Sequence, residues 1–265
     1  MNRGPIGIFD SGLGGLTVAR AVYHRLPGES TIYFGDTARV PYGPKSPDTV
    51  RHYSLEILDW LVGEGVKAVV VACNTSTAHA LEALAARSPV PVLGVIEPGA
   101  RAALRGRAGA RVGVIGTTGT VASGAYPRAL AALAPGVEVV QQACPLFVPL
   151  VEEGWFEHPV TELVAREYLA PLLAAGVEVL VLGCTHYPLL APVLAEVAGP
   201  AVRLVDSAEE TAVALEELLQ REGLVAPAGQ RPRHRYVVSD APERFASVAA
   251  RFLGERAGTA EVIAW

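Results

Sequence analysis

Two cysteines of this chain stand in closely similar local sequences. Cys73 lies in Ala-Cys-Asn-Thr and Cys184 in Gly-Cys-Thr-His, and each follows a run of apolar, mostly β-branched residues. We expect each run to form a strand and the segment after each cysteine to begin a helix. Both thiols are therefore predicted at the carboxyl end of a strand, where open α/β sheets form their ligand crevices.

The beginning of a helix suits both a reactive thiol and an anionic ligand. Its free N–H groups and partial positive charge lower the pKa of a nearby thiol and bind a carboxylate. Asn74 and Thr75 follow the first cysteine, and Thr185 and His186 follow the second. Cysteine is also a common core residue, but two in matching contexts favour a functional site. The third, Cys144, lacks this context and is predicted to lie in the core.

Two further polar segments follow predicted strands. Residues 10–15 read Asp-Ser-Gly-Leu-Gly-Gly, and residues 116–120 read Gly-Thr-Thr-Gly-Thr. Glycine lets the backbone approach a ligand and hydroxyl groups bind carboxylate oxygens, although the same residues also serve as simple helix caps. The dinucleotide-binding pattern Gly-x-Gly-x-x-Gly is absent, so we predict no dinucleotide site here.

Several kinds of chemistry could use these groups. Cys73, Cys184 and His186 could be three zinc ligands, although the chain has no Cys-x-x-Cys pair. A cysteine nucleophile with His186 as its base would make a thiol hydrolase or transferase, and would leave the second cysteine without a role. Pyridoxal chemistry needs a lysine, but Lys67 lies at the start of its predicted strand and Lys45 lies in a predicted loop.

A reaction that uses both thiols is the inversion of an amino-acid α-carbon. One group must remove the proton from one face while another delivers a proton to the opposite face. One thiolate and one thiol meet this demand in both directions without a cofactor. Because the α-proton is very weakly acidic, the site must also stabilise a carbanionic transition state and exclude water.

The elements that would position these groups alternate along the chain. Eight strands are predicted, at residues 5–9, 31–34, 66–72, 91–95, 111–115, 137–140, 177–182 and 201–205, with helices between them. These strands are continuous apolar runs, as is typical of parallel strands that are covered on both faces. The fold class is therefore α/β with doubly wound, mainly parallel sheets.

A weak internal repeat divides the chain into two halves. Residues 6–12 resemble residues 112–118, and residues 65–75 resemble residues 176–186, so each half carries one strand-end cysteine. We predict a first domain at 1–95 plus 208–265 and a second at 96–207, with the site in the cleft between them. The helix at 207–221 and the tail would return to the first half, although the tail after Pro227 carries no motif that we can interpret.

Composition limits the remaining possibilities. The chain has 265 residues, of which 51% are hydrophobic and 18% are charged, with a net charge of −5. It is long enough to bury a core, its apolar runs are too short to span a membrane, and it lacks the basic surface of a nucleic-acid-binding protein. We expect a small-molecule substrate, no disulfides, no signal peptide and a cytoplasmic location.

Five segments resemble the glutamate racemases, of the cofactor-independent aspartate/glutamate racemase superfamily. They cover residues 9–16 (Phe-Asp-Ser-Gly-Leu-Gly-Gly-Leu), 35–36 with 41–43 (Gly-Asp and Pro-Tyr-Gly), 72–75 (Ala-Cys-Asn-Thr), 145–154 (Pro-Leu-Phe-Val-Pro-Leu-Val-Glu-Glu-Gly) and 183–188 (Gly-Cys-Thr-His-Tyr-Pro). The resemblance implies two similar domains related by pseudo-two-fold symmetry, and interconversion of L- and D-glutamate without a cofactor or a metal. It also implies a role in peptidoglycan synthesis, cell-wall biogenesis and cell shape, and a homodimer.

The resemblance also implies the site residues. The two catalytic cysteines of the family correspond to Cys73, which would deprotonate D-glutamate, and Cys184, which would deprotonate L-glutamate. Substrate-binding positions correspond to Asp10, Ser11, Tyr42, Gly43, Asn74, Thr75, Thr185 and His186, and less directly to Thr117 and Thr120.

We make a more specific prediction for two of these side chains and for Glu152. Asp10 is a candidate for the substrate ammonium group, and His186 is a candidate for tuning Cys184. Glu152 either supports the site from behind or is a solvated helix end. An aspartate racemase or another racemase of the same superfamily, a binding protein for small carboxylates and a thiol hydrolase remain as alternatives.

Overall fold

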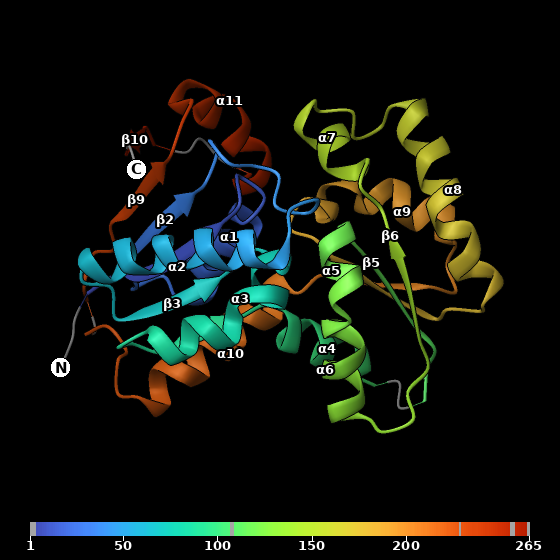
Figure 1. Ribbon diagram of the computed structural model, residues 1–265, viewed down its shortest axis with the longest axis horizontal. Helices are drawn as coiled ribbons and strands as arrows, with labels where there is room; N and C mark the ends of the chain where they lie inside the picture. Colours follow the sequence, from blue (N-terminus) through green and yellow to red (C-terminus); the bar gives the residue numbers. More distant parts are fainter. Residues whose placement is uncertain (1–3, 107–108, 228, 255–257, 264–265) are drawn as a thin grey trace.

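The computed structural model describes residues 4–106, 109–227, 229–254 and 258–263 (Figure 1). Its strands are β1 Ile6–Asp10, β2 Thr31–Gly35, β3 Ala68–Val71, β4 Val92–Gly94, β5 Val112–Gly116, β6 Val139–Ala143, β7 Val179–Gly183, β8 Arg203–Val205, β9 His234–Val238 and β10 Ala260–Val262. Its α-helices are α1 Leu16–Arg25, α2 Pro47–Gly63, α3 Asn74–Arg87, α4 Ile96–Leu104, α5 Thr118–Ser123, α6 Ala125–Leu133, α7 Phe147–Glu152, α8 Pro159–Ala174, α9 Ala191–Ala198, α10 Ala208–Arg221 and α11 Pro242–Leu253, and a 3₁₀-helix spans Tyr187–Leu190.

The strands form two parallel sheets in two lobes that lie side by side (Figure 1). The first sheet has the order β10-β9-β2-β1-β3-β4, and the second has the order β6-β5-β7-β8. Every strand pair recorded in the two sheets is parallel. The predicted α/β class with doubly wound parallel sheets is confirmed.

The strand order itself is repeated. The order β2-β1-β3-β4 in the first sheet corresponds to β6-β5-β7-β8 in the second, so β1 corresponds to β5 and β3 to β7. These are the strands that the sequence repeat pairs. Because β1, β3, β5 and β7 are interior strands, helices cover both of their faces, and all four are fully buried.

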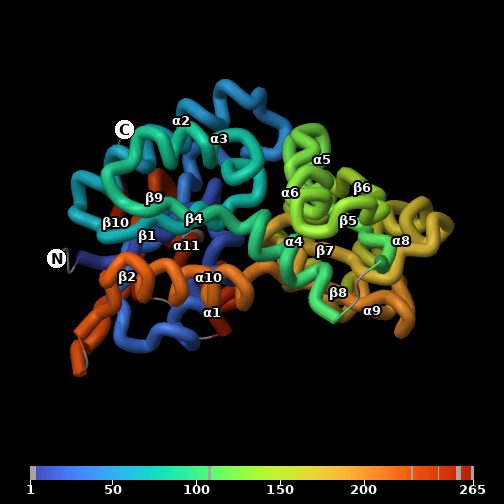
Figure 2. Tube along the Cα trace, turned by 90° about the horizontal axis from the view of Figure 1, so that it is seen from below, coloured from blue at the N-terminus to red at the C-terminus, as the bar shows by residue number. Residues whose placement is uncertain are grey.

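Neighbouring residues of one strand pack into different cores. In β1, Ile8 lies in the cluster that includes α1, α10 and α11, whereas Phe9 lies in the cluster with α2 and α3. In the second sheet, α4 and α6 cover one face, and α8 and α9 cover the other. Helix α4 runs between the lobes (Figure 2). No helix in the described ranges is long and apolar enough to cross a membrane.

The eight predicted strands correspond to β1 through β8, with ends displaced by up to three residues. The sequence prediction missed β9, α11 and β10, which follow Pro227. Strand β9 begins in an Arg-rich segment and β10 is a short, largely exposed edge strand, so neither has the long apolar run of an interior strand. Strand β9 pairs with β2, and the tail thereby joins the first sheet. The domain limits 1–95 plus 208–265 and 96–207 stay a prediction.

A buried ion pair fixes the amino-terminal edge of the first sheet. Lys67, directly before β3, contacts Glu29 through Nζ and Oε2 at 2.5 Å, and both side chains are almost fully buried. The other carboxylate oxygen of Glu29 accepts the backbone N–H of Ala226 at 2.7 Å. Glu29 therefore links the start of β3 to the segment that leads from α10 into β9.

Loss of one partner of this pair should be costly. We expect Lys67→Met to destabilise the protein by about 3–5 kcal/mol, because a buried carboxylate would lose its counter-charge. The double variant Glu29→Gln with Lys67→Met removes both charges and keeps an acceptor for Ala226, so it should recover most of that loss. Urea unfolding measures the unfolding free energy of both variants. An equal loss of stability in the single and double variants would contradict a charge-pair role.

Candidate active site

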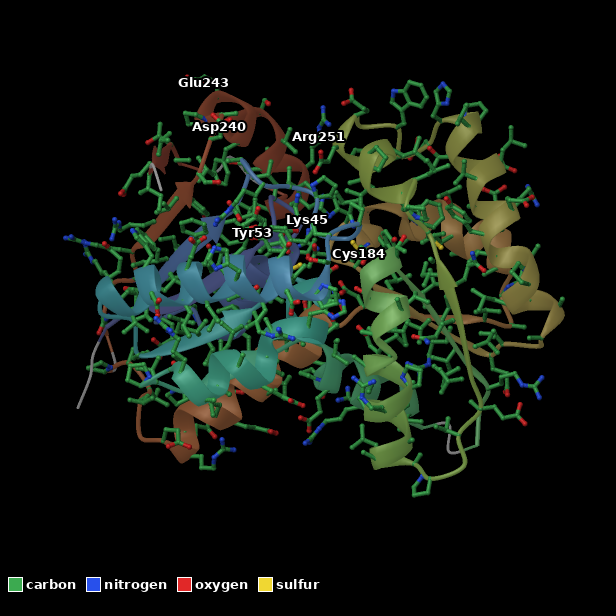
Figure 3. The ribbon with its side chains drawn as sticks, viewed as in Figure 1. Lys45, Tyr53, Cys184, Asp240, Glu243 and Arg251 are labelled. Atoms are coloured by element: carbon green, nitrogen blue, oxygen red, sulfur yellow. The ribbon has the colours of Figure 1, made fainter. Side chains whose placement is uncertain are left out.

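Four strands of corresponding position deliver one polar residue each to a common cavity. Ser11 follows β1, Thr117 follows β5, Cys184 follows β7, and Cys73 lies two residues beyond β3. All four line the same small cavity between the lobes. The carboxyl ends of the two sheets therefore meet there, and Figure 3 shows Cys184 at this junction.

The cavity has a volume of about 20 Å³ and most of the predicted site residues line it. Those that do are Ser11, Tyr42, Gly43, Cys73, Asn74, Thr75, Thr117, Cys184, Thr185 and His186. Its remaining wall is apolar and consists of Val40, Pro41 and Val148, which the sequence analysis did not single out. Pro41 and Val148 lie inside segments that carry the family resemblance, and this proximity is the one signal that could have found them.

Three predicted residues lie outside the cavity wall. Asp10 and Thr120 are fully buried, and Glu152 lies behind His186. Glu152 also lines a neighbouring, larger cavity of about 290 Å³ that shares Val40, Pro41 and Val148 with the small one. Each of these three side chains contacts a residue of the cavity wall.

Cys73 is a neutral thiol at pH 7. Its Sγ accepts the backbone N–H of Ser76 at 3.4 Å, and its thiol donates to Ser11 Oγ at 3.6 Å. Burial, together with the nearby carboxylate of Asp10, raises the pKa of Cys73 to about 11. The helix N–H group opposes this shift, as the sequence predicts, but burial outweighs it.

Cys184 has a different electrostatic neighbour. His186 places Nδ1 3.9 Å from the Cys184 sulfur and Nε2 3.2 Å from Glu152 Oε1. Burial lowers the pKa of His186, but its hydrogen bonds to Cys184 and Glu152 outweigh burial and raise that pKa to about 10. The imidazole is therefore protonated at neutral pH, and its positive charge lies beside the Cys184 sulfur.

Asp10 bridges the lobes rather than facing the cavity. Its carboxylate accepts the backbone N–H of Gly12 at 3.0 Å and the hydroxyl of Thr185 at 3.3 Å. Burial raises its pKa, and the charge of His186 opposes that shift. Asp10 does not line the cavity, and its contact with a substrate ammonium group stays a prediction. Its observed contact positions Thr185, which does line the cavity.

Hydroxyl groups from both lobes form a cluster beside the cavity. Thr75 Oγ1 lies 2.9 Å from Thr117 Oγ1 and 3.3 Å from Thr120 Oγ1, and Thr117 donates to Thr120 at 3.0 Å. Next to them the backbone N–H of Gly119 donates to the carbonyl of Gly43 at 2.9 Å. A Cβ on Gly43 would lie 2.8 Å from Thr117 Cβ, so only glycine permits this close approach.

Asn74 and Tyr42 complete the polar lining. The Asn74 side chain is buried, and its Nδ2 has no hydrogen-bond partner among the described residues. Such a donor suits a carboxylate ligand. The Tyr42 hydroxyl donates to Asp36, which also accepts from Arg39 and Ser239. This network fixes the loop that carries Tyr42 and Gly43.

The zinc hypothesis finds no support in the geometry. Within the part of the chain that the structure describes, no group of three or more His, Cys, Asp or Glu side chains is arranged to hold a metal ion. Cys73, Cys184 and His186 line the cavity without forming such a group.

Comparison with known proteins identifies the family. The family model described as Asp/Glu/Hydantoin racemase matches residues 16–215. The chain belongs to the Asp/Glu/hydantoin racemase family. A protein of Geobacter metallireducens named glutamate racemase is 57% identical over 253 residues, which are 96% of this chain and 94% of that protein.

Solved structures of racemases resemble this one over nearly the whole chain. A glutamate racemase from Thermus thermophilus, solved with β-chloro-D-alanine, has a TM-score of 0.88 at 48% identity and covers 99% of this chain and 98% of its own. A glutamate racemase from Francisella tularensis, solved with D-glutamate, has a TM-score of 0.93 at 36% identity and covers 100% of this chain and 98% of its own.

The raised pKa of His186 makes stability depend on pH. Above its unfolded pKa of 6.5 the unfolded chain releases a proton that the folded protein keeps until about pH 10. The stabilisation that this proton provides is complete below pH 6.5 and is lost as the pH rises toward 10. The unfolding free energy of wild type should therefore fall more steeply over this range than that of His186→Asn.

Urea unfolding at several pH values checks this expectation. The exposed His24 offers a matched control, and His24→Asn should retain the wild-type pH dependence. Parallel curves for wild type and His186→Asn would contradict the protonated state assigned to His186.

Proposed function

We propose that this protein is a glutamate racemase that interconverts L- and D-glutamate with two cysteines and no cofactor. The observation that carries the proposal is the pair of buried thiols, one from the end of each sheet, that line a single cavity. The 57% identity to a curated glutamate racemase over nearly the full chain supports glutamate as the substrate. We further propose that the enzyme is cytoplasmic and supplies D-glutamate for peptidoglycan synthesis.

In the L-to-D direction, Cys184 is the base and Cys73 is the acid. The Cys184 thiolate, beside the His186 imidazolium, takes the α-proton from one face of L-glutamate. Cys73, a neutral thiol with a pKa of about 11, donates its proton to the opposite face of the same carbon. The product is D-glutamate, and the enzyme is left with a Cys73 thiolate and a Cys184 thiol.

In the D-to-L direction, the same groups exchange roles. The Cys73 thiolate removes the α-proton of D-glutamate, and the Cys184 thiol protonates the other face. During this step the N–H of Ser76 donates to the Cys73 sulfur, and the hydroxyl of Ser11, which accepts from the neutral thiol, would rotate to donate to the thiolate and stabilise its charge. One turnover in each direction returns both sulfurs to their starting states, so the proton balance closes.

The carbanionic transition state needs polar contacts and a dry site. Asn74 Nδ2 and the hydroxyl groups of Thr75, Thr117 and Thr185 would hold the substrate carboxylates and the charge that spreads onto the α-carboxylate. Burial excludes water, which would otherwise quench the carbanion without control of the face.

The small cavity volume requires an opening motion. A cavity of about 20 Å³ has room for about one water molecule, and glutamate is several times larger. The neighbouring cavity of about 290 Å³, which shares Val40, Pro41 and Val148, is the route of entry that we propose. Movement of the lobes or of the segment that contains Val40 and Tyr42 would join the two cavities and admit the substrate.

We also propose that two copies of the chain form a homodimer, as the family resemblance implies. Large apolar side chains are exposed on the α7–α8 side of the second lobe, among them Leu146, Trp155 and Leu163. Such side chains are common where two protein surfaces meet.

Isotope incorporation tests the two-base reaction. We expect that L-glutamate in D₂O yields D-glutamate that carries deuterium at the α-carbon, because the Cys73 thiol exchanges with D₂O and transfers deuterium to that carbon. Cys73→Ser and Cys184→Ser should each lower racemisation by about 10²-fold or more, since each removes one acting acid–base group. Chiral chromatography with mass spectrometry reads both quantities.

The third cysteine supplies the matched control. Cys144 is fully buried but does not line the cavity, so Cys144→Ser should keep the racemisation rate of the folded protein. Full activity of either Cys73→Ser or Cys184→Ser would contradict the two-base proposal. If the protein inverted aspartate rapidly and did not react with glutamate, its substrate would be aspartate.

A further inference from the structure

The orientation of the Asn74 side chain decides what this residue offers to the cavity. A carboxamide has an acceptor oxygen on one side and a donor NH₂ group on the other. Asn74 is 3% exposed and lines the cavity, and its Nδ2 has no acceptor among the residues that the structure describes. A buried donor without a partner costs free energy, unless a ligand supplies the acceptor.

The other side of the same amide is held from the opposite lobe. The hydroxyl of Tyr126 donates to Asn74 Oδ1 at 2.8 Å. Tyr126 lies in the first turn of α6, beside the second sheet, whereas Asn74 is the first residue of α3, beside the first sheet. With its oxygen bound to Tyr126, the amide must direct its NH₂ group away from α6.

Tyr126 is itself closely confined. It is fully buried, and a Cβ on Gly183 would lie 3.0 Å from its Cε2 atom. A Cβ on Gly99 would lie 3.2 Å from its hydroxyl oxygen. Because Gly99 and Gly183 have no side chains, the tyrosine ring fits closely against them and has little freedom to move.

The electrostatic surroundings keep Tyr126 a donor. Burial raises its pKa, and the negative charges of Asp206 and Cys184 raise that pKa further. The hydroxyl therefore stays protonated at physiological pH. Tyr126 is absent from the cavity wall, and its hydroxyl group is hydrogen-bonded to Asn74, which does line the cavity.

We propose that Tyr126 is a positioning residue, whose hydroxyl group fixes the Asn74 amide so that Nδ2 donates to a carboxylate of the substrate. The proposal rests on the function proposed above. Without the hydroxyl group the amide would be free to turn over and present Oδ1 to the carboxylate, which repels it. Tyr126 would thus control substrate affinity from outside the site.

The variant Tyr126→Phe removes only the hydroxyl group and keeps the packed ring. We expect KM for both enantiomers to rise about tenfold, which is the loss of one hydrogen bond to a charged group, with a much smaller change in kcat. Because free L- and D-glutamate have equal energies, kcat/KM should fall by the same factor in both directions. Calorimetric titration with D-glutamate should show a matching loss of affinity.

A double-mutant cycle separates positioning from general structural support. Asn74→Ala should raise KM at least as much as Tyr126→Phe, and the double variant should be no worse than Asn74→Ala alone. Additive losses would overturn the proposal, because Tyr126 would then act on a group other than Asn74.

Tyr187→Phe is the matched control. Tyr187 is also fully buried in the second lobe, and its hydroxyl group donates to the Cys144 carbonyl at 2.8 Å. This variant should lose a similar amount of thermal stability and retain the wild-type KM. A wild-type KM in Tyr126→Phe, or an equal rise in Tyr187→Phe, would overturn the proposal. An inactive wild-type protein would instead refute the proposed function.

Discussion

Inversion of a stereocentre by two protein groups imposes a geometric constraint, since the groups must reach one carbon from opposite faces. In this protein a repeated strand order brings the two candidate groups to one cavity. Strands β3 and β7 hold corresponding positions in two parallel sheets, and both end at the same cavity. The cysteines that follow them are therefore brought together from separate lobes, and the hydroxyl groups that follow β1 and β5 arrive at the same place. The proposed reaction depends on this meeting of strand ends.

The two thiols occupy the same cavity in unequal environments. Cys73 is held as a neutral acid by burial and by the charge of Asp10. Cys184 lies beside His186, whose bond to Glu152 helps to keep the imidazole protonated. In the proposed reaction this inequality makes Cys73 the acid and Cys184 the base in the L-to-D direction. Burial changes the pKa of both Cys73 and His186. The closed cavity therefore affects the acid–base chemistry and also excludes water.

The sequence predicted the interior of the fold better than its edges. Strands such as β3 and β7 are continuous apolar runs that end in a cysteine, and this pattern located both the sheets and the cavity. Strands β9 and β10 lie at the outer side of the first sheet, where β9 pairs with β2 and β10 with β9, and they were missed because neither is a long apolar run. Asp10 stays a predicted contact of the substrate ammonium group, and in the structure its carboxylate accepts the hydroxyl of Thr185. Sequence spacing shows that a residue lies near a strand end, and it does not show which way the side chain turns. Tyr126 carries no motif at all, and its hydrogen bond to Asn74 in the other lobe is evident only from the structure.

The most direct test is a crystal structure of this protein with bound D-glutamate. The proposed reaction predicts that the sulfur atoms of Cys73 and Cys184 lie on opposite faces of the substrate α-carbon, each about 3.5 Å from it, with the lobes closed around the ligand. A complex in which both sulfurs face the same side of that carbon, or in which one is too distant to exchange a proton with it, would contradict the two-thiol mechanism.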